Sequence, residues 1–292
     1  MTQNKNSTKF NSSHRGRTSK RRKTGGGGGF LHWLRSIPLW GFVLGGVGIV
    51  ALYCFVLFHF FVNPYSFQWK AIYGETTYPK GYSVRGIDIS HHQQTIDWNR
   101  LRNASMDNDP VTFVIIKATE GETMVDDNFN DNFFEARHND FVRGAYHYLS
   151  PTTSARRQAE FFLHQVHLEE GDLPPVLDVE EEDKWKAAGK SRRQIEDMAL
   201  TWLRIVGKHY HVRPIIYSNY KFRTDVLSDS AFNQYPFWVA HYYVEKPRGD
   251  IRWLFWQHTD CGRVEGIRGT VDCNLFNGTR QQLDSILIKD ID

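Results

Sequence analysis

The chain has 292 residues, of which 40% are hydrophobic and 24% are charged, and this excludes a small disulfide scaffold, a wholly disordered chain and a multi-pass membrane protein. The formal net charge of +3 hides an asymmetry, because residues 1–74 contain ten Lys and Arg but no Asp or Glu. Residues 75–292 contain 26 basic and 33 acidic residues, so the folded part is acidic and its charge does not indicate nucleic-acid binding.

The first 36 residues form a basic head of low complexity. They are rich in Ser, Thr, Asn, Lys and Arg, and they include the cluster Lys20–Lys23 and the glycine run Gly25–Gly29. Such a segment cannot bury a hydrophobic core, so we predict that residues 1–36 are a disordered cytoplasmic tail. Binding of nucleic acid or acidic lipid by the cluster is an alternative. A topological role is favoured, and we expect no nucleic-acid partner.

An apolar segment follows, in which residues 37–62 contain no Asp, Glu, Lys or Arg. At about 1.5 Å per residue, a helix of this length exceeds the roughly 30 Å hydrocarbon core of a bilayer. The positive charge lies almost wholly on its N-terminal side, which places the N-terminus in the cytoplasm. We therefore predict a single-pass membrane protein with a linker over residues 63–80 and a folded domain over residues 81–292 that is periplasmic or extracellular.

A cleaved secretory signal is the competing interpretation of this segment. The apolar stretch is longer than the usual 7–15 residues, and Asn63-Pro64-Tyr65 is not a small-residue cleavage site. We therefore favour the uncleaved anchor. An exported domain permits a disulfide between Cys261 and Cys273, although two exported cysteines can equally stay reduced.

Short β-rich runs recur along the exported domain and predict eight strands. These runs are Val84–Ser90, Thr112–Ala118, Arg143–Leu149, Pro175–Glu180, Pro214–Ser218, Phe237–Tyr242, Trp253–Thr259 and Val271–Phe276. Apolar stripes at helical spacing lie between the earlier strands, over residues 155–166 and 195–206, and Ser191 with Gln194 predicts a capping box before the second. The alternation favours a parallel sheet covered by helices, whereas after Phe237 loops replace the helices. We predict a modified (β/α) barrel of the α/β class.

The predicted strands carry four carboxylates that are candidate site residues. Asp88 alternates with two isoleucines at the end of the first strand, and Asp178 and Glu180 share one face at the end of the fourth. The eighth strand adds Asp272. Each acid alone has a structural interpretation as a helix cap or an acceptor of backbone N–H groups. Clustered together they favour glycoside hydrolysis, which needs a protonated acid beside an ionised carboxylate.

Aromatic residues near the same strand ends agree with a sugar ligand, although period two along a strand makes about half of them core residues. They are Tyr146, Tyr148, Tyr217, Trp238, Tyr242 and Trp256. A metal site is the other functional interpretation of the acids, but no acid–His spacing accompanies them, so we expect neither a metal nor a cofactor. We interpret His91, His92 and His147 as rim or core histidines, and Lys117 with Glu120 as an ion pair or cleft residues.

Six blocks of sequence resemble, in order, the motifs of glycoside hydrolase family 25, the Chalaropsis-type lysozymes. The blocks lie at residues 86–93, 113–121, 144–148, 173–180, 216–219 and, as a pair, 256–257 with 271–274. The resemblance spans about residues 84–279, and it implies a modified barrel that cleaves the β-1,4 bond between N-acetylmuramic acid and N-acetylglucosamine in peptidoglycan glycan strands.

The resemblance also implies roles for individual residues. Glu180 would be the general acid, Asp178 would orient the acetamido group of the substrate or stabilise the cationic centre, and Asp88 and Asp272 would maintain the charge pattern and bind substrate. A same-strand Asp-x-Glu pair favours the substrate-assisted route with net retention over a direct carboxylate nucleophile. We expect the following residues to bind substrate: Tyr146, Tyr148, Tyr217, Trp238, Tyr242 and Gln257.

Two alternative functions of the exported domain remain open on the sequence, and a third alternative is a membrane-anchored structural or interaction protein that uses its basic tail. One is a non-catalytic peptidoglycan-binding module on the same barrel, which would have no use for a high-pKa acid. The other is a hydrolase of a different N-acetylglucosamine polymer, such as chitin. The absence of wall-binding repeats from the sequence favours localisation by the membrane anchor.

Overall fold

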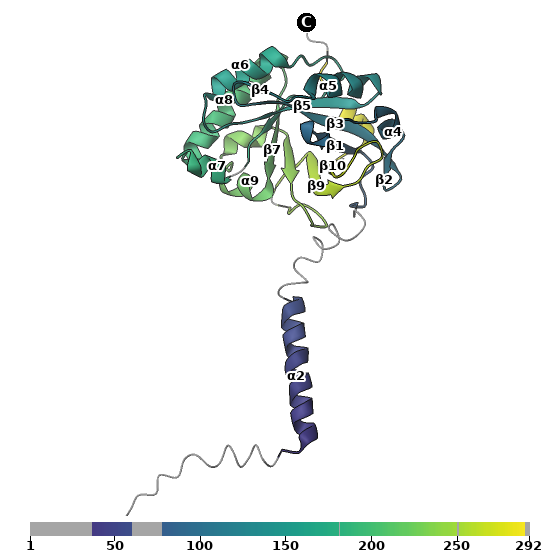
Figure 1. Cartoon of the computed structure of the whole chain (residues 1–292). Coiled ribbons are helices and arrows are strands. Elements are labelled where there is room, and N and C mark those ends of the chain that lie inside the picture. Colours follow the sequence, from purple (N-terminus) through teal and green to yellow (C-terminus); the bar gives the residue numbers. More distant parts are fainter. Residues whose placement is uncertain (1–36, 60–77, 181, 250, 290–292) are drawn as a thin grey trace, which may run out of the picture. The chain divides into compact units, whose positions relative to one another are not determined.

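The computed structural model describes residues 37–59, 78–180, 182–249 and 251–289, which fall into two units, residues 1–63 and 64–292 (Figure 1). In the first unit, α2 (Leu39–Leu57) is the one helix among the described residues that is long and apolar enough to cross a membrane. It forms within the predicted span 37–62. The predicted disordered tail and most of the predicted linker lie outside the described residues.

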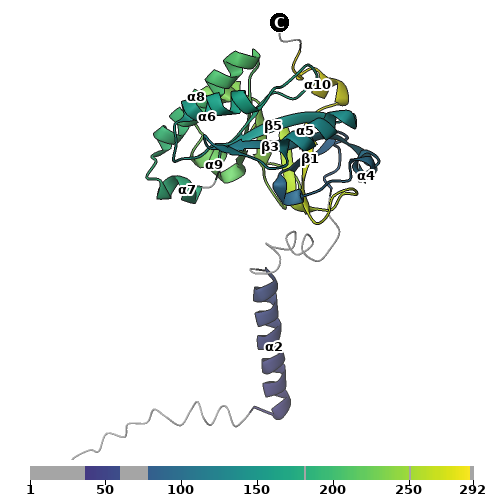
Figure 2. The same cartoon turned by 45° about the horizontal axis from the view of Figure 1, so that its top comes forward.

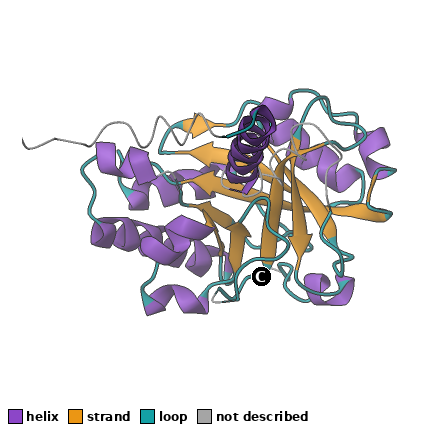
Figure 3. Cartoon of the chain, turned by 90° about the horizontal axis from the view of Figure 1, so that it is seen from below, coloured by secondary structure: helices purple, strands orange, loops and turns teal. Residues whose placement is uncertain are grey.

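The second unit is an eight-stranded closed barrel with helices around it (Figure 3). The barrel strands follow one another around the ring in the order β1, β3, β5, β6, β7, β8, β9, β10, and pairing of β1 with β3 closes the ring. Their bounds are β1 Arg85–Ile89, β3 Asp109–Glu120, β5 Val142–Tyr148, β6 Val176–Asp178, β7 Ile215–Asn219, β8 Phe237–Ala240, β9 Phe255–Gly262 and β10 Val271–Phe276. All eight predicted strands are therefore confirmed, with shifted ends.

Helices occupy the connections between the earlier strands (Figure 2). They are α4 Trp98–Arg102, α5 Phe129–His138, α6 Ala155–Gln165, α7 Glu182–Ala187, α8 Arg192–Tyr210 and α9 Tyr220–Asp225, while α10 Arg280–Asp284 follows the last strand. Short pieces complete the unit: η3 His91–Gln93, β2 Ser105–Met106, β4 Met124–Val125 and η4 Ser230–Gln234. Ser191 and Gln194 form the predicted capping box of α8. No helix occurs between β8 and β10 among the described residues, as predicted.

One barrel strand runs against the others. β10 pairs antiparallel with both β1 and β9, whereas the remaining barrel pairs are parallel. The start of β10 therefore lies beside the C-terminal end of β1, and Asp272 is directly opposite Asp88. This reversal brings a residue from the beginning of a strand to the barrel face where the other strands end.

Two hydrophobic clusters pack against the two faces of the barrel sheet. Alternate residues of β3 divide between them: Val114 and Ile116 pack in the larger cluster with the helices, while Phe113 and Ile115 pack in the smaller one. The smaller cluster also requires a close approach at Gly86, because a Cβ atom there would lie 2.4 Å from the Phe113 ring. The absence of a side chain at Gly86 thus allows β1 to pack closely against the Phe113 ring of the smaller cluster.

Candidate active site

A pocket of about 210 Å³ lies at the barrel face where β1, β6, β7 and β8 end. Its lining joins all four predicted acids to most of the predicted substrate-binding residues. The lining residues are Asp88, Tyr146, Asp178, Glu180, Tyr217, Trp238, Tyr242, Gln257, Asp260 and Asp272. Among the described residues, five carboxyl groups and no Lys, Arg or His line it, so its environment is strongly acidic.

Asp88 lies at the centre of a fixed hydrogen-bond network. Its Oδ1 accepts hydrogen bonds from Gln257 Nε2 at 2.7 Å and from Asn274 Nδ2 at 2.6 Å. The opposite ends of these two amides are also held, because Tyr217 and Tyr242 donate to Gln257 Oε1, and Trp238 Nε1 donates to Asn274 Oδ1. Both amides therefore present N–H groups to Asp88, an arrangement that favours an ionised carboxylate.

Asp88 and Asp272 lie directly opposite each other on β1 and β10, and their carboxyl groups share a hydrogen bond. Burial raises the pKa of Asp272 to about 9, and the charge of Asp88 adds to the effect. Burial also raises the pKa of Asp88, to about 6, against the opposing effect of the hydrogen bonds from Asn274 and Gln257. Near neutral pH the pair therefore holds one proton, which resides mainly on Asp272.

This shared proton predicts that Asp272→Asn stabilises the folded domain at alkaline pH. The folded state retains the Asp272 proton to about pH 9, whereas the unfolded chain loses it near pH 4. The folded state binds more protons within this window, so the free energy of unfolding falls as pH rises. The uncharged amide removes this dependence. We expect the melting temperature to exceed that of the wild type by a few degrees at pH 8.5, since 1 kcal/mol corresponds to about 2–4 °C.

The measurement is thermal unfolding of the full chain in detergent at pH 5 and pH 8.5. Asp127→Asn is the matched control, because it removes an exposed carboxylate outside the pocket. Equal loss of melting temperature between the two pH values in the wild type and in Asp272→Asn would contradict the shared proton.

Asp178 and Glu180 reach the pocket from the end of β6. Val179 between them packs in the larger core cluster, so the two acids project to the opposite face, as the alternation predicts. The backbone around them is anchored: Val179 N–H donates to Tyr217 O, Ser218 Oγ donates to Val179 O, and Trp185 Nε1 donates to Glu180 O at 2.8 Å. Two carboxyl groups thus sit on a rigid segment.

The tyrosines of the pocket stay protonated. Burial raises the pKa of Tyr146, and the charges of Asp88, Asp178 and Asp272 raise it further. The pKa values of Tyr217 and Tyr242 rise as well, with burial as the largest cause. Neutral hydroxyl groups and aromatic faces are suited to the hydroxyl groups and apolar ring faces of a sugar.

Asp260 is a pocket residue that the sequence analysis missed. Gln257 and Asp260 both line the pocket although they are three residues apart on one strand. The ladder between β9 and β10 explains this, because its register shifts on both sides of Cys273. Such bulges break the period-two rule, and the sequence carries no local signal for them.

Several predicted candidates lie elsewhere. Tyr148 does not line the pocket, and its ring faces the Nζ atoms of Lys117 at 5.3 Å and Lys184 at 4.7 Å. Trp256 is fully buried in the larger cluster. His147 is also buried, between Thr119 and Gln158, and burial lowers its pKa to about 3.

The remaining candidates are resolved by direct contacts. Lys117 and Glu120 form an ion pair of 2.6 Å, and exposed His91 pairs with Asp126. Cys261 and Cys273 are both free thiols. No group of three or more His, Cys, Asp and Glu among the described residues is arranged to hold a metal ion.

Comparison with known proteins gives consistent matches. The model of the family described as glycosyl hydrolases family 25 matches residues 87–267. The chain is 44% identical to Escherichia coli K12 protein YegX over 210 residues, 72% of this chain and 75% of that protein. It is 34% identical to Lysozyme M1 of Streptomyces globisporus over 214 residues, 68% of this chain and 70% of that one.

A solved structure agrees with these matches. The bacterial lysozyme from Streptomyces coelicolor superposes with a TM-score of 0.65 at 31% identity, covering 71% of this chain and 98% of that one. The likeness covers nearly all of that lysozyme.

Proposed function

The chain belongs to glycosyl hydrolase family 25, and from this premise we propose that it is a membrane-anchored muramidase. It would cleave the β-1,4 bond between N-acetylmuramic acid and N-acetylglucosamine in peptidoglycan. The observation that carries the proposal is the acidic pocket, in which Asp178 and Glu180 share one face beside the Asp88–Asp272 pair. The names of the relatives, Lysozyme M1 among them, support the same substrate.

In the proposed mechanism Glu180 donates a proton to the glycosidic oxygen as the bond breaks. Asp178 accepts a hydrogen bond from the acetamido N–H of the sugar whose anomeric carbon reacts. The acetamido carbonyl oxygen bonds to that carbon as the leaving sugar departs with the proton from Glu180, which gives a cyclic oxazolinium intermediate. Water then opens the resulting cyclic intermediate, with Glu180 as the base, and the product retains its configuration. The ionised Asp88 stabilises the positive charge that develops on the sugar ring.

The pocket's hydrogen bonds supply the order that this mechanism requires. Tyr217, Tyr242 and Gln257 are linked directly, so the ring faces and the amide keep fixed positions when a sugar enters. The groups that surround the reacting centre are therefore oriented before the substrate binds, which lowers the cost of reorganisation during the reaction.

The experiment is digestion of purified peptidoglycan by the full chain in detergent, beside chitin oligomers. Mass spectrometry of the products should find muropeptides that end in reducing N-acetylmuramic acid. Release of products from chitin alone would indicate that the substrate is another polymer of N-acetylglucosamine. No release from either would leave a binding module.

Anchoring is proposed from α2, whose 19 residues contain no charged side chain. We expect the full chain to remain in the membrane fraction after alkaline carbonate extraction, because such a helix spans the hydrocarbon core. A chain with four Leu→Arg and Val→Arg substitutions in α2 should be released, since each arginine is costly at the helix centre. Release of the unaltered chain would contradict the anchor.

A further inference from the structure

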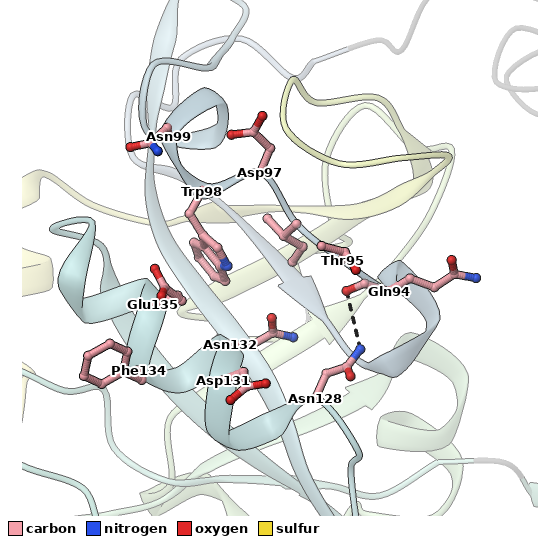
Figure 4. Close-up of a pocket in the computed structure, with 11 residues that line it drawn as sticks. Gln94, Thr95, Asp97, Trp98, Asn99, Asn128, Asp131, Asn132, Phe134 and Glu135 are labelled. Atoms are coloured by element: carbon pink, nitrogen blue, oxygen red, sulfur yellow. Dashed lines mark hydrogen bonds between the residues drawn. The ribbon is translucent and has the colours of Figure 1, made fainter.

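A second concave site is formed by segments that follow β1 and β4. It is a groove of about 540 Å³ between the segment Gln94–Asn99, which follows β1 and η3, and residues 128–135 at the start of α5 (Figure 4). This volume lies within the roughly 300–1,000 Å³ of pockets that hold small ligands. None of its lining residues belongs to the acidic pocket, so it is a separate site.

Asp126 links the groove to the acidic pocket. Its Oδ1 accepts a hydrogen bond from the backbone of Asn128, and its Oδ2 accepts one from the backbone of His91. Asn128 lines the groove, and its Nδ2 donates to Gln94 O across it. The negative charge of Asp126 also contributes to the raised pKa of Tyr146, which lines the acidic pocket. Gln94 of the groove also follows Asp88 of the acidic pocket by six residues, so the two sites are close along the chain.

An unsatisfied amide points to a ligand in this groove. Asn132 is only 5% exposed, and its Nδ2 is buried without a hydrogen-bond partner among the described residues. Figure 4 shows its side chain between α5 and the segment that contains Thr95. A buried amide without a partner destabilises a fold, and native structures retain few such groups. A ligand carbonyl in the groove would accept this hydrogen bond.

The groove also carries uncompensated negative charge. Asp97, Asp131 and Glu135 line it, and none of them forms an ion pair within the described part of the chain. Their observed bonds are to uncharged groups: Asp97 caps α4 through Arg100 N, and Glu135 accepts from Asn139 Nδ2. Phe134 adds an apolar surface that is 65% exposed. These features fit a ligand with an ammonium group, a carbonyl group and an aliphatic stem.

We propose that this groove binds the peptide branch of a peptidoglycan strand, with Asn132 donating to a peptide carbonyl and Asp131 and Glu135 accepting from a free ammonium group. The inference rests on the proposed function and adds a substrate feature to it. In peptidoglycan the peptide is attached to N-acetylmuramic acid, beside the bond to be cleaved. An uncross-linked branch that ends in a diamino acid carries both groups, whereas the bare glycan carries neither ammonium nor peptide carbonyls.

The test compares two soluble substrates with the full chain in detergent. One is an uncross-linked glycan strand whose peptides contain a diamino acid, and the other is the same strand after an amidase has removed the peptides. In Asp131→Asn, KM for the peptide-bearing strand should rise about tenfold with kcat unchanged, while KM for the bare strand stays constant. Asp127→Asn, the same change on an exposed residue outside the groove, should alter neither.

Asn132→Leu separates recognition from folding. Leucine is similar in size and removes an unpartnered buried amide, so the melting temperature should not fall. The KM for the peptide-bearing strand should nevertheless rise as in Asp131→Asn. Equal KM changes on both substrates, or no change on either, would overturn the inference.

Failure of the proposed function gives a different result. If the wild-type chain cleaves neither strand, equilibrium binding of the two strands is measured instead. Preferential binding of the peptide-bearing strand that Asp131→Asn abolishes would keep the groove assignment without the muramidase. Equal binding of the two strands would contradict the assignment of the groove to the peptide branch.

Discussion

Glu180→Gln should lower the release of reducing ends from peptidoglycan by about 10³-fold and leave the melting temperature unchanged. Proton donation by a positioned side chain contributes about 10²–10⁴-fold to a rate, and glutamine keeps the shape of glutamate but has no acidic proton to transfer. Glu180 is anchored through its backbone by Trp185 Nε1, so the substitution changes the chemistry without moving the segment. The rate is measured as reducing sugar released by the full chain in detergent.

Glu182→Gln is the matched control for this prediction. Glu182 lies two residues away, outside the pocket, and forms surface ion pairs with Lys186 and Lys221. Exposed pairs of this kind contribute little to stability, and Glu182 does not line the pocket, so activity should stay within twofold of the wild type. Retention of more than a tenth of wild-type activity in Glu180→Gln would reject Glu180 as the general acid.

Asp178→Asn should lower kcat by about 10²-fold, because its carboxylate is proposed to hold the acetamido group and to stabilise the positive charge that develops there. The amide keeps the size of the side chain but loses the charge. KM should change less than kcat, since the interaction strengthens mainly in the transition state. Steady-state kinetics on uncross-linked glycan strands separate the two effects.

Asp260→Asn provides the comparison for Asp178. Asp260 also lines the pocket, but its carboxylate receives a hydrogen bond from Tyr243, which holds it at the edge formed by β9. We expect a loss below tenfold for this variant. Equal losses in the two variants would show that any pocket charge has the same effect.

The anomeric configuration of the first product, followed by proton NMR, should be retained, and inversion would reject the substrate-assisted route.

The barrel was predictable because its strands carry their burial pattern in short runs. Phe113-Val114-Ile115-Ile116 is apolar on both faces, and the structure divides these residues between the two core clusters. The helices were predictable where an apolar stripe and a capping box coincide, as in α8. Strand ends were less accurate: β6 ends at Asp178 rather than at Glu180, where its ladder with β7 also ends.

The site was predictable where side chains alternate and unpredictable where the ladder is irregular. Asp88, Asp178 and Glu180 reach the pocket by simple alternation along β1, along β6 and through the two residues that follow β6. Asp260 reaches it through a bulge in β9, which pairing with a distant strand determines. The Asn274 amide is a similar case, since its role follows from its bonds to Asp88 and Trp238 and not from any local pattern.

The antiparallel insertion of β10 has a consequence for biosynthesis. β10 pairs with β1 on one side and with β9 on the other, so both of these strands keep an open edge until the last barrel strand has emerged from the ribosome. The same strand supplies Asp272 and Asn274, which complete the surroundings of Asp88. A nascent or truncated chain that ends before residue 271 therefore lacks Asp272 and Asn274, and its acidic pocket is incomplete.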